Sequence, residues 1–245
     1  MVRNFKLTIA YEGTNYHGWQ SQLNKPTIQK TIEEAISVVT KQKIDLIGSG
    51  RTDKGVHALG QVANFIADTN IEDNKVKIAI NSNLPKDIRI VQSEEVSLDF
   101  HSRFDAHNKT YIYNIYNDRV SSPFYSNYSY FVPYVLDFKI MEKASRIFVG
   151  THDFKGFMAT GSDVKTTVRT IYKANIEREG KILRFYITGN GFLYNMVRIM
   201  VGTLIDIGKG KKEIECIEKA FNEKDRSILG QTARPEGLFL KEVSY

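Results

Sequence analysis

The sequence has few of the side chains that build metal sites and disulfides. It contains a single cysteine, Cys216, which excludes an internal disulfide. The five histidines stand at positions 17, 57, 101, 107 and 152 without the close spacing of metal ligands, so we expect no transition-metal site. Cys216 lies among helix-forming residues, and we expect it to pack as a small apolar side chain.

Long apolar runs and low-complexity tracts are also missing. Neither a membrane-spanning stretch nor an N-terminal signal segment is visible, so we expect a cytoplasmic protein. Only 5 prolines occur in 245 residues, and 42% of the residues are hydrophobic. These values are typical of a globular chain that forms one large domain or two small ones.

The chain carries more positive than negative charge and is rich in aromatic residues. Lysine and arginine exceed aspartate and glutamate by 34 to 28, which gives a net charge of +6. Thirteen tyrosines and 14 phenylalanines add rings that can stack on bases. These features favour a nucleic-acid partner, although excess charge also serves solubility and most rings on strands belong in a core.

Alternating and helical patterns succeed one another in both halves of the chain. In the first half we expect strands at residues 5–11, 44–47, 62–66 and 88–96, a helix capped by Thr27, and a helix over 73–84 that ends before Pro85. In the second half we expect a strand at 109–117, a helix over 137–149 closed by Gly150, a hairpin turning at Glu179-Gly180, and a helix from Phe192 with Gly208 after its end. The repeated order predicts two similar α/β units, 1–104 and 105–245.

The stretch GSGRTDKGVHALGQVANF at 48–65 concentrates glycines around one carboxylate. Its spacing, G-x-G-x-x-x-x-G, differs from both the dinucleotide fingerprint and the P-loop, which argues against a nucleotide-binding enzyme. Asp53 lies between Arg51 and Lys54, where neighbouring cations favour an ionised, nucleophilic carboxylate. The alternative is that Asp53 only stabilises a turn.

Seven stretches together give a specific resemblance. They are YEGTNYHGWQSQ (11–22), the 48–65 stretch, NSNLPKDIRI (81–90), FHSRFDAHNKTYIYNI (100–115), GTHDFKGF (150–157), GNGFLYNMVRIMVGTL (189–204) and ARPEGLFL (233–240). In this order, over the whole chain, they resemble the tRNA pseudouridine synthase A family. The aromatic loop at 119–134 is the more variable part, and no function is assigned to it.

The resemblance implies the pseudouridine synthase fold, with two ferredoxin-like α/β units that each have a mixed sheet and helices on one side. It also implies an enzyme that isomerises uridine to pseudouridine in the anticodon stem-loop of tRNA, at positions 38, 39 and 40. No cofactor is expected, because the reaction exchanges a C–N bond for a C–C bond without net electron transfer. A homodimer that holds tRNA is implied as well. The alternative from another class is a non-catalytic RNA-binding or RNA-chaperone module.

The same resemblance assigns roles to four residues. Asp53 corresponds to the catalytic nucleophile, and Tyr111 to the active-site tyrosine that stacks on the freed uracil. Arg198 corresponds to the basic residue beside the aspartate. Arg51 corresponds to the arginine that holds a phosphate or fills the space of the extruded nucleotide. Outside the resemblance, Tyr111 is as well explained by a strand core and Arg51 by a solvated loop.

Overall fold

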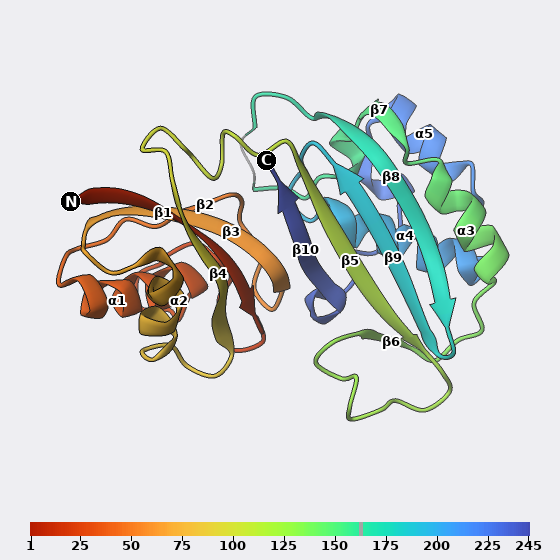
Figure 1. The fold of residues 1–245 in the computed structure, drawn as a ribbon. Coiled ribbons are helices and arrows are strands. Elements are labelled where there is room, and N and C mark those ends of the chain that lie inside the picture. Colours follow the sequence, from red (N-terminus) through yellow and green to blue (C-terminus); the bar gives the residue numbers. More distant parts are fainter. Residues whose placement is uncertain (162–163) are drawn as a thin grey trace. The chain divides into compact units, whose positions relative to one another are not determined.

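The computed structural model describes residues 1–161 and 164–245 and confirms a mixed α/β protein. The chain divides into two compact units (Figure 1). Unit 1 comprises Met1–His107 and Phe239–Tyr245, and unit 2 comprises Asn108–Leu238. Among the described residues, no helix is long and apolar enough to cross a membrane.

The sheet of unit 1 has the strand order β4-β1-β3-β10. Its strands are β1 (Val2–Tyr11), β3 (His57–Asp68), β4 (Ile88–Val96) and β10 (Leu238–Ser244), with the short β2 (Ile47–Gly48) paired to β3. Strand β1 is antiparallel to both β3 and β4, whereas β10 is parallel to β3. The sheet is therefore mixed, as expected.

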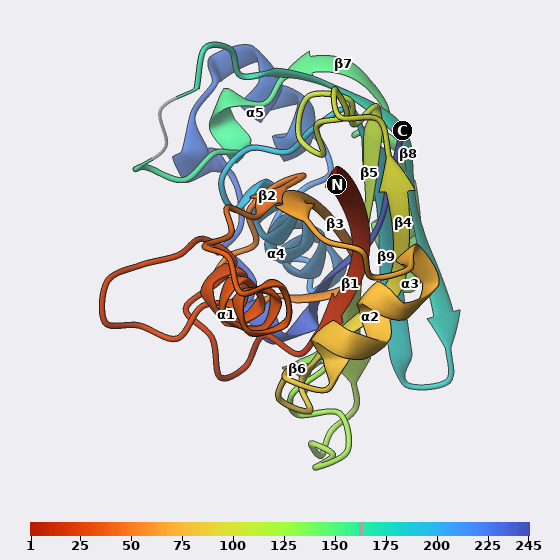
Figure 2. The same cartoon turned by 60° about the vertical axis from the view of Figure 1, so that its left-hand side comes forward.

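Alternation in β1 explains which face of that sheet is covered. Phe5, Leu7, Ile9 and Tyr11 are buried, because alternate residues of a strand face the same side. The helices α1 (Ile28–Thr40) and α2 (Asp73–Asn81) lie on one side of the strands (Figure 2). Helix α1 contributes Ile28, Ile32, Ala35 and Ile36 to the core, at the predicted helical spacing.

The sheet of unit 2 has the strand order β5-β9-β8-β7. Its strands are β5 (Asn108–Asn117), β7 (Gly150–Asp153), β8 (Val168–Glu179) and β9 (Ile182–Gly189), with β6 (Tyr130–Val132) paired parallel to β5. The other pairs are antiparallel. Helices α3 (Phe138–Arg146), α4 (Met196–Gly208) and α5 (Cys216–Glu223) lie on one face of this sheet (Figure 1). The described part of this unit also contains three short 3₁₀ turns: Lys155–Phe157, Arg226–Ile228 and Pro235–Gly237.

Several predicted boundaries are wrong for identifiable reasons. Helix α4 begins at Met196 rather than Phe192, after Asn195 with a φ of +59°. Gly208 is the last residue of α4 and not a cap, and a Cβ there would lie 2.6 Å from the sulfur of Met141 on α3. The glycine is needed for close helix packing.

The other departures concern ends and caps. Helix α1 begins after Thr27 as predicted, but the buried Thr27 hydroxyl makes no capping bond. Helix α2 ends at Asn81, and the strand predicted at 44–47 is reduced to β2. Helix α3 ends at Arg146, and Gly150 begins β7 instead of closing the helix. The β8–β9 hairpin turns one residue later than predicted, because Glu179 pairs with Ile182 across the Gly180-Lys181 loop.

Candidate functional site

Asp53 occupies the first position of a tight turn in unit 1. The backbone N–H of Val56 donates to the carbonyl oxygen of Asp53 at 3.1 Å. Gly55, at the third position, has a φ of +77°, a conformation that few residues other than glycine adopt readily. The turn lies between β2 and β3, and the Asp53 side chain is half-buried. Its backbone direction is thus fixed by a closed turn.

The stretch at residues 11–22 packs directly against this turn. A Cβ at Gly13 would lie 2.0 Å from the Val56 carbonyl oxygen, and one at Gly18 would lie 2.6 Å from the Thr52 carbonyl oxygen. The backbone N–H of Trp19 donates to that same Thr52 oxygen at 3.0 Å. Two glycines therefore allow one motif to contact the backbone that carries Asp53.

Two aromatic side chains complete the contact. The Tyr11 hydroxyl is 2.8 Å from Thr52 Oγ1 in a buried hydrogen bond. The Trp19 side chain is 2% exposed and covers Gly48, where a Cβ would lie 2.6 Å from the indole. Gly48 thus allows the Trp19 ring to pack closely against the loop.

Polar side chains of β3 hold the first half of the loop. The buried Ser49 hydroxyl donates to Gln61 Oε1 at 2.7 Å, and Gln61 Nε2 donates to the Gly50 carbonyl oxygen at 2.9 Å. Ser49 N–H donates to the Val62 carbonyl oxygen at 2.8 Å. Buried polar groups with partners of this kind stabilise a single loop conformation.

Asp87 anchors the supporting stretch from its other side. Its Oδ1 accepts a 2.8 Å hydrogen bond from the Tyr16 hydroxyl, and its carbonyl oxygen accepts one from the Glu12 N–H at 2.9 Å. Burial and the Asp87 contact raise the pKa of Tyr16 above its ordinary value. Sequence reasoning missed both residues as contributors to the site, although both lie in stretches that carry the family resemblance.

His57 has a structural part in this arrangement. Its Nδ1 accepts the Gly13 N–H at 3.1 Å, and its ring stacks on Phe239 with centroids 4.6 Å apart. An accepting Nδ1 means that the neutral ring carries its proton on Nε2. Among residues 1–161 and 164–245, no group of three or more histidine, cysteine, aspartate or glutamate residues could hold a metal. Arg51 lies two residues before Asp53 in the same loop and is exposed.

Tyr111 lies on β5 of unit 2, opposite Ile187 of β9. Its side chain is 9% exposed, and its ring meets Phe192 edge to face with centroids 5.0 Å apart. Phe192 belongs to the stretch that leads into α4. The predicted tyrosine is therefore in direct contact with the motif that carries Arg198.

Arg198 is held in the first turn of α4 by three hydrogen bonds. Its Nε donates to the Ala233 carbonyl oxygen at 2.7 Å, and a terminal guanidinium nitrogen donates to Asn195 Oδ1 at 2.6 Å. The Ala233 N–H donates back to the Arg198 carbonyl oxygen at 3.0 Å. The two side-chain bonds fix the orientation of the planar guanidinium group, and the backbone bond holds the two segments together.

Close backbone packing makes the Ala233 contact available. A Cβ at Gly202 of α4 would lie 1.6 Å from the Gln231 carbonyl oxygen. The N–H of Gly230 donates to the buried Thr203 hydroxyl at 3.1 Å. The ARPEG stretch thus lies against α4 because the helix has a glycine where the two backbones meet.

The structure therefore groups the four predicted residues in pairs. Arg51 and Asp53 share one loop of unit 1, and Tyr111 is linked through Phe192 to the stretch bearing Arg198 in unit 2. That the two pairs form one active site stays a prediction.

Comparisons with known proteins identify the family of the chain. The family model described as tRNA pseudouridine synthase matches residues 7–105 and 144–245. The chain is 51% identical over 244 residues to tRNA pseudouridine synthase A of Acetivibrio thermocellus and 48% identical to that of Caldicellulosiruptor bescii, covering 100% of both chains in each case. A solved Cbf5-Nop10-Gar1 complex gives a TM-score of 0.35 at 14% identity, over 82% of this chain and 54% of that one.

Proposed function

The chain belongs to the tRNA pseudouridine synthase family, and we propose that it isomerises uridine to pseudouridine in the anticodon arm of tRNA with Asp53 as its nucleophile. The observation that carries the assignment of Asp53 is its turn, closed by the Val56 N–H and supported by Gly13 and Gly18. Because these contacts hold the turn in one conformation, the Asp53 carboxylate is presented in a single direction. The same membership disfavours the non-catalytic RNA-binding alternative.

The reaction breaks the C–N bond between ribose and uracil and joins the ribose to C5 of the base. The C5 hydrogen leaves as a proton while N1 of the detached base gains one, so atoms and charge balance without an oxidant. A carboxylate can serve as covalent or electrostatic partner to the charge that develops on the sugar or base. We assign this part to Asp53.

The other three residues receive supporting roles in this proposal. Tyr111 stacks on the detached uracil and takes part in removing the C5 proton. Arg198 stabilises the ionised form of Asp53, and the three hydrogen bonds at its position support such a fixed charge. Arg51, exposed in the Asp53 loop, holds a phosphate or occupies the space left by the extruded nucleotide.

We also propose that the enzyme acts in the cytoplasm as a homodimer on folded tRNA. The net charge of +6 supports a polyanionic partner. Binding through phosphates should release counterions, so tRNA affinity should fall steeply as salt rises.

One experiment tests the function directly. The purified chain is incubated with unmodified tRNA transcripts, without added cofactor or metal, and pseudouridine is mapped at each uridine. We expect pseudouridine at positions 38, 39 and 40 of the anticodon arm and nowhere else. A chain that binds the transcripts tightly but leaves every uridine unchanged would instead support the RNA-binding alternative.

A further inference from the structure

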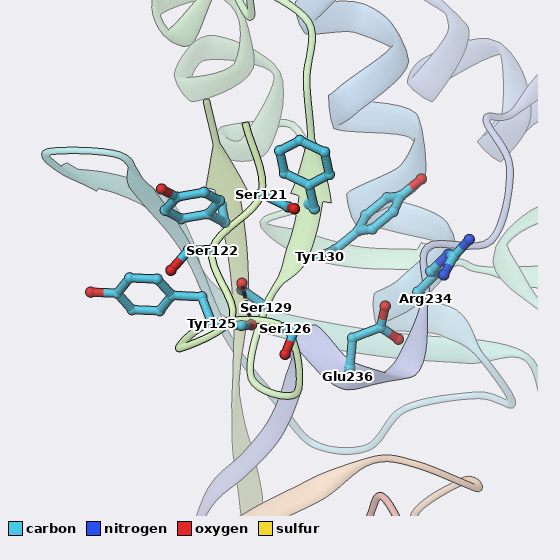
Figure 3. A pocket seen from close by; sticks show the side chains of 10 residues that line it. Ser121, Ser122, Tyr125, Ser126, Ser129, Tyr130, Arg234 and Glu236 are labelled. Atoms are coloured by element: carbon cyan, nitrogen blue, oxygen red, sulfur yellow. Dashed lines mark hydrogen bonds between the residues drawn. The ribbon is translucent and has the colours of Figure 1, made fainter. Parts of the chain in front are cut away.

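The aromatic loop at residues 119–134 forms one wall of a cavity in unit 2 that the proposed reaction does not use. The cavity has a volume of about 320 Å³. Serine hydroxyls and Tyr125 lie on one side of it, with Tyr130, Arg234 and Glu236 on the other (Figure 3). A volume near 300 Å³ is at the lower limit of ligand pockets, which suits one small ligand.

Side chains of β5 hold this loop in place. Asn117 Nδ2 donates to the carbonyl oxygens of Val132 and Tyr134, at 2.9 and 2.7 Å. Asn114 Nδ2 donates to the Tyr128 carbonyl oxygen at 3.1 Å. These hydrogen bonds from strand side chains to loop carbonyl oxygens hold the loop in a defined conformation.

Aromatic packing fixes the floor of the cavity. The ring of buried Tyr116 stacks on Tyr125 with centroids 5.2 Å apart and an interplanar angle of 20°. The buried Ser129 donates its hydroxyl to the Tyr125 carbonyl oxygen at 2.8 Å. Tyr125 is nevertheless 44% exposed, so part of its surface remains available for stacking.

Two charged side chains, Arg234 and Glu236, face the cavity (Figure 3). Neither Arg234 nor Glu236 forms an ion pair or a side-chain hydrogen bond with any residue in the described ranges 1–161 and 164–245. Their backbone is fixed, because the buried Tyr113 hydroxyl donates to the Arg234 carbonyl oxygen at 2.6 Å. A guanidinium and a carboxylate are thus presented together on a rigid segment.

A second cavity of about 150 Å³ shares Tyr130 with the first as a lining residue. Lys209 and Lys211 line this smaller cavity together with Asp206, and Lys209 Nζ lies 4.7 Å from the centroid of the Tyr134 ring. A strand with a base in the larger cavity can pass Tyr130 and bring its neighbouring phosphate to these ammonium groups.

We propose that the larger cavity binds a guanosine nucleotide of an RNA strand, and that Lys209 and Lys211 hold the adjoining phosphate. Guanine presents two adjacent N–H donors, N1–H and N2–H, which a single carboxylate such as Glu236 can accept together. Arg234 binds the phosphate, the serine hydroxyls bind the ribose hydroxyls, and Tyr125 stacks on the base. This inference rests on the proposed RNA-modifying function and adds a second recognition site to it.

Mononucleotides test the base preference. GMP, AMP, CMP and UMP are each measured by equilibrium dialysis against the full chain, and we expect GMP to bind best. Glu236→Gln should weaken GMP binding about tenfold and leave UMP binding unchanged, because only the paired acceptors are lost. Ser126→Ala, at the opposite wall of the cavity, should also weaken the binding of GMP. Equal binding of all four nucleotides, or no change in Glu236→Gln that retains the wild-type melting temperature, would overturn the proposal.

RNA strands test the source of the nucleotide. An oligouridylate with one central guanosine should bind more tightly than the same strand with adenosine. The double variant Lys209→Ala/Lys211→Ala should weaken binding of the guanosine strand and leave GMP binding unchanged. Lys143 is an exposed lysine on α3, and Lys143→Ala should alter neither binding. A double variant that binds the strand normally would show that only a free nucleotide uses the cavity and overturn the RNA assignment. Pseudouridine formation is measured on the same preparations, so loss of the base preference with intact activity refutes this inference alone.

Discussion

Arg198 and Ala233 are joined by two opposed hydrogen bonds, one from the Arg198 Nε to the Ala233 carbonyl oxygen and one from the Ala233 N–H to the Arg198 carbonyl oxygen. The pair joins the start of α4 to the ARPEG stretch. Both partners belong to motifs of the family resemblance, and neither motif alone indicates the bond. If Arg198 acts in the site as proposed, the geometry of its guanidinium group should matter as well as its charge.

Arg198→Lys separates those two properties. Lysine keeps the positive charge but cannot reproduce the Nε bond to Ala233 together with the terminal bond to Asn195. A lost hydrogen bond to a charged group costs about 1.5–3 kcal/mol, so we expect kcat to fall about 10- to 100-fold. Single-turnover kinetics on a tRNA transcript measures this effect. Arg146→Lys, at an exposed arginine paired with Glu142, is the matched control and should retain full activity.

Gly18→Ala tests whether the 11–22 stretch positions Asp53. Gly18 has a φ of +89°, and a Cβ there would press on the Thr52 carbonyl oxygen at 2.6 Å. A displacement of a catalytic group by about 1 Å can cost about 100-fold in rate, so if Asp53 is the nucleophile, kcat should fall far more than tRNA affinity. The rate constant and the dissociation constant are measured on the same protein.

Gly161→Ala is the control for backbone strain alone. Gly161 has a similar φ of +93°, but a Cβ there meets no described atom within 4 Å. Both variants carry the left-handed penalty of about 1–2 kcal/mol per residue, and only Gly18→Ala adds the contact with the loop. Similar kcat values for the two variants would remove the positioning role of Gly18.

The alkaline stability of the protein should depend on Tyr113. Burial, with a smaller contribution from Glu236, raises the pKa of Tyr113 well above its ordinary value. The folded state then binds this proton more tightly than the unfolded state. The stabilisation is therefore complete below about pH 10 and is lost as the pH rises above that value towards the folded-state pKa. Tyr113→Phe should flatten the decline of the unfolding free energy between pH 9 and 11, as measured by urea titration. An unchanged slope would show that other groups control alkaline unfolding.

Local patterns in the sequence predicted most elements but not their long-range partners. The alternation of Phe5, Leu7 and Ile9 correctly predicted a half-buried strand, because burial on one face leaves a period of two. No local pattern shows that β10 pairs in parallel with β3, a contact that joins residues about 180 positions apart. The start of α4 was placed too early because its apolar stripe extends into the irregular turn before Asn195.

The same contrast between local pattern and long-range contact holds for the candidate site. Motifs identified Asp53 and Arg198 as residues of interest, whereas the glycines that support them have meaning only beside the backbone they touch. Gly13 faces Val56 and Gly202 faces Gln231, each across a large separation in sequence. Such contacts depend on tertiary packing, which composition and spacing do not contain.

Two variants of Tyr111 separate stacking from proton transfer. Tyr111→Phe keeps the ring and its edge-to-face contact with Phe192 but removes the hydroxyl, whereas Tyr111→Ala removes both. If the hydroxyl takes part in removing the C5 proton, Tyr111→Phe should lose most of its activity, and Tyr111→Ala should be no more active than Tyr111→Phe. Pseudouridine formation over time on a tRNA transcript is the measurement. Nearly normal turnover in Tyr111→Ala would exclude this tyrosine from the site.

Asp53→Asn is the decisive variant, because it preserves size and hydrogen-bonding capacity while deleting the charge. The turn depends on the backbone of Asp53 and on Gly55, so the fold and the loop should survive the change. We expect pseudouridine formation to be abolished and tRNA affinity to stay within a few-fold of the wild type. Both are measured on one transcript, by site-specific mapping and by filter binding.

Asp53→Glu provides the sharper control for geometry. It retains the carboxylate but moves it outward by one methylene, about 1 Å, from a turn that Gly13, Gly18 and Trp19 hold in place. Because the surrounding backbone is too closely packed to follow, a rate loss of about 100-fold is expected with little change in binding. Pseudouridine above a trace level from Asp53→Asn would refute the nucleophile assignment and direct the search to Asp105 or Asp153. Loss of tRNA binding together with activity, in a variant that remains folded, would instead make Asp53 a residue of the RNA-binding surface.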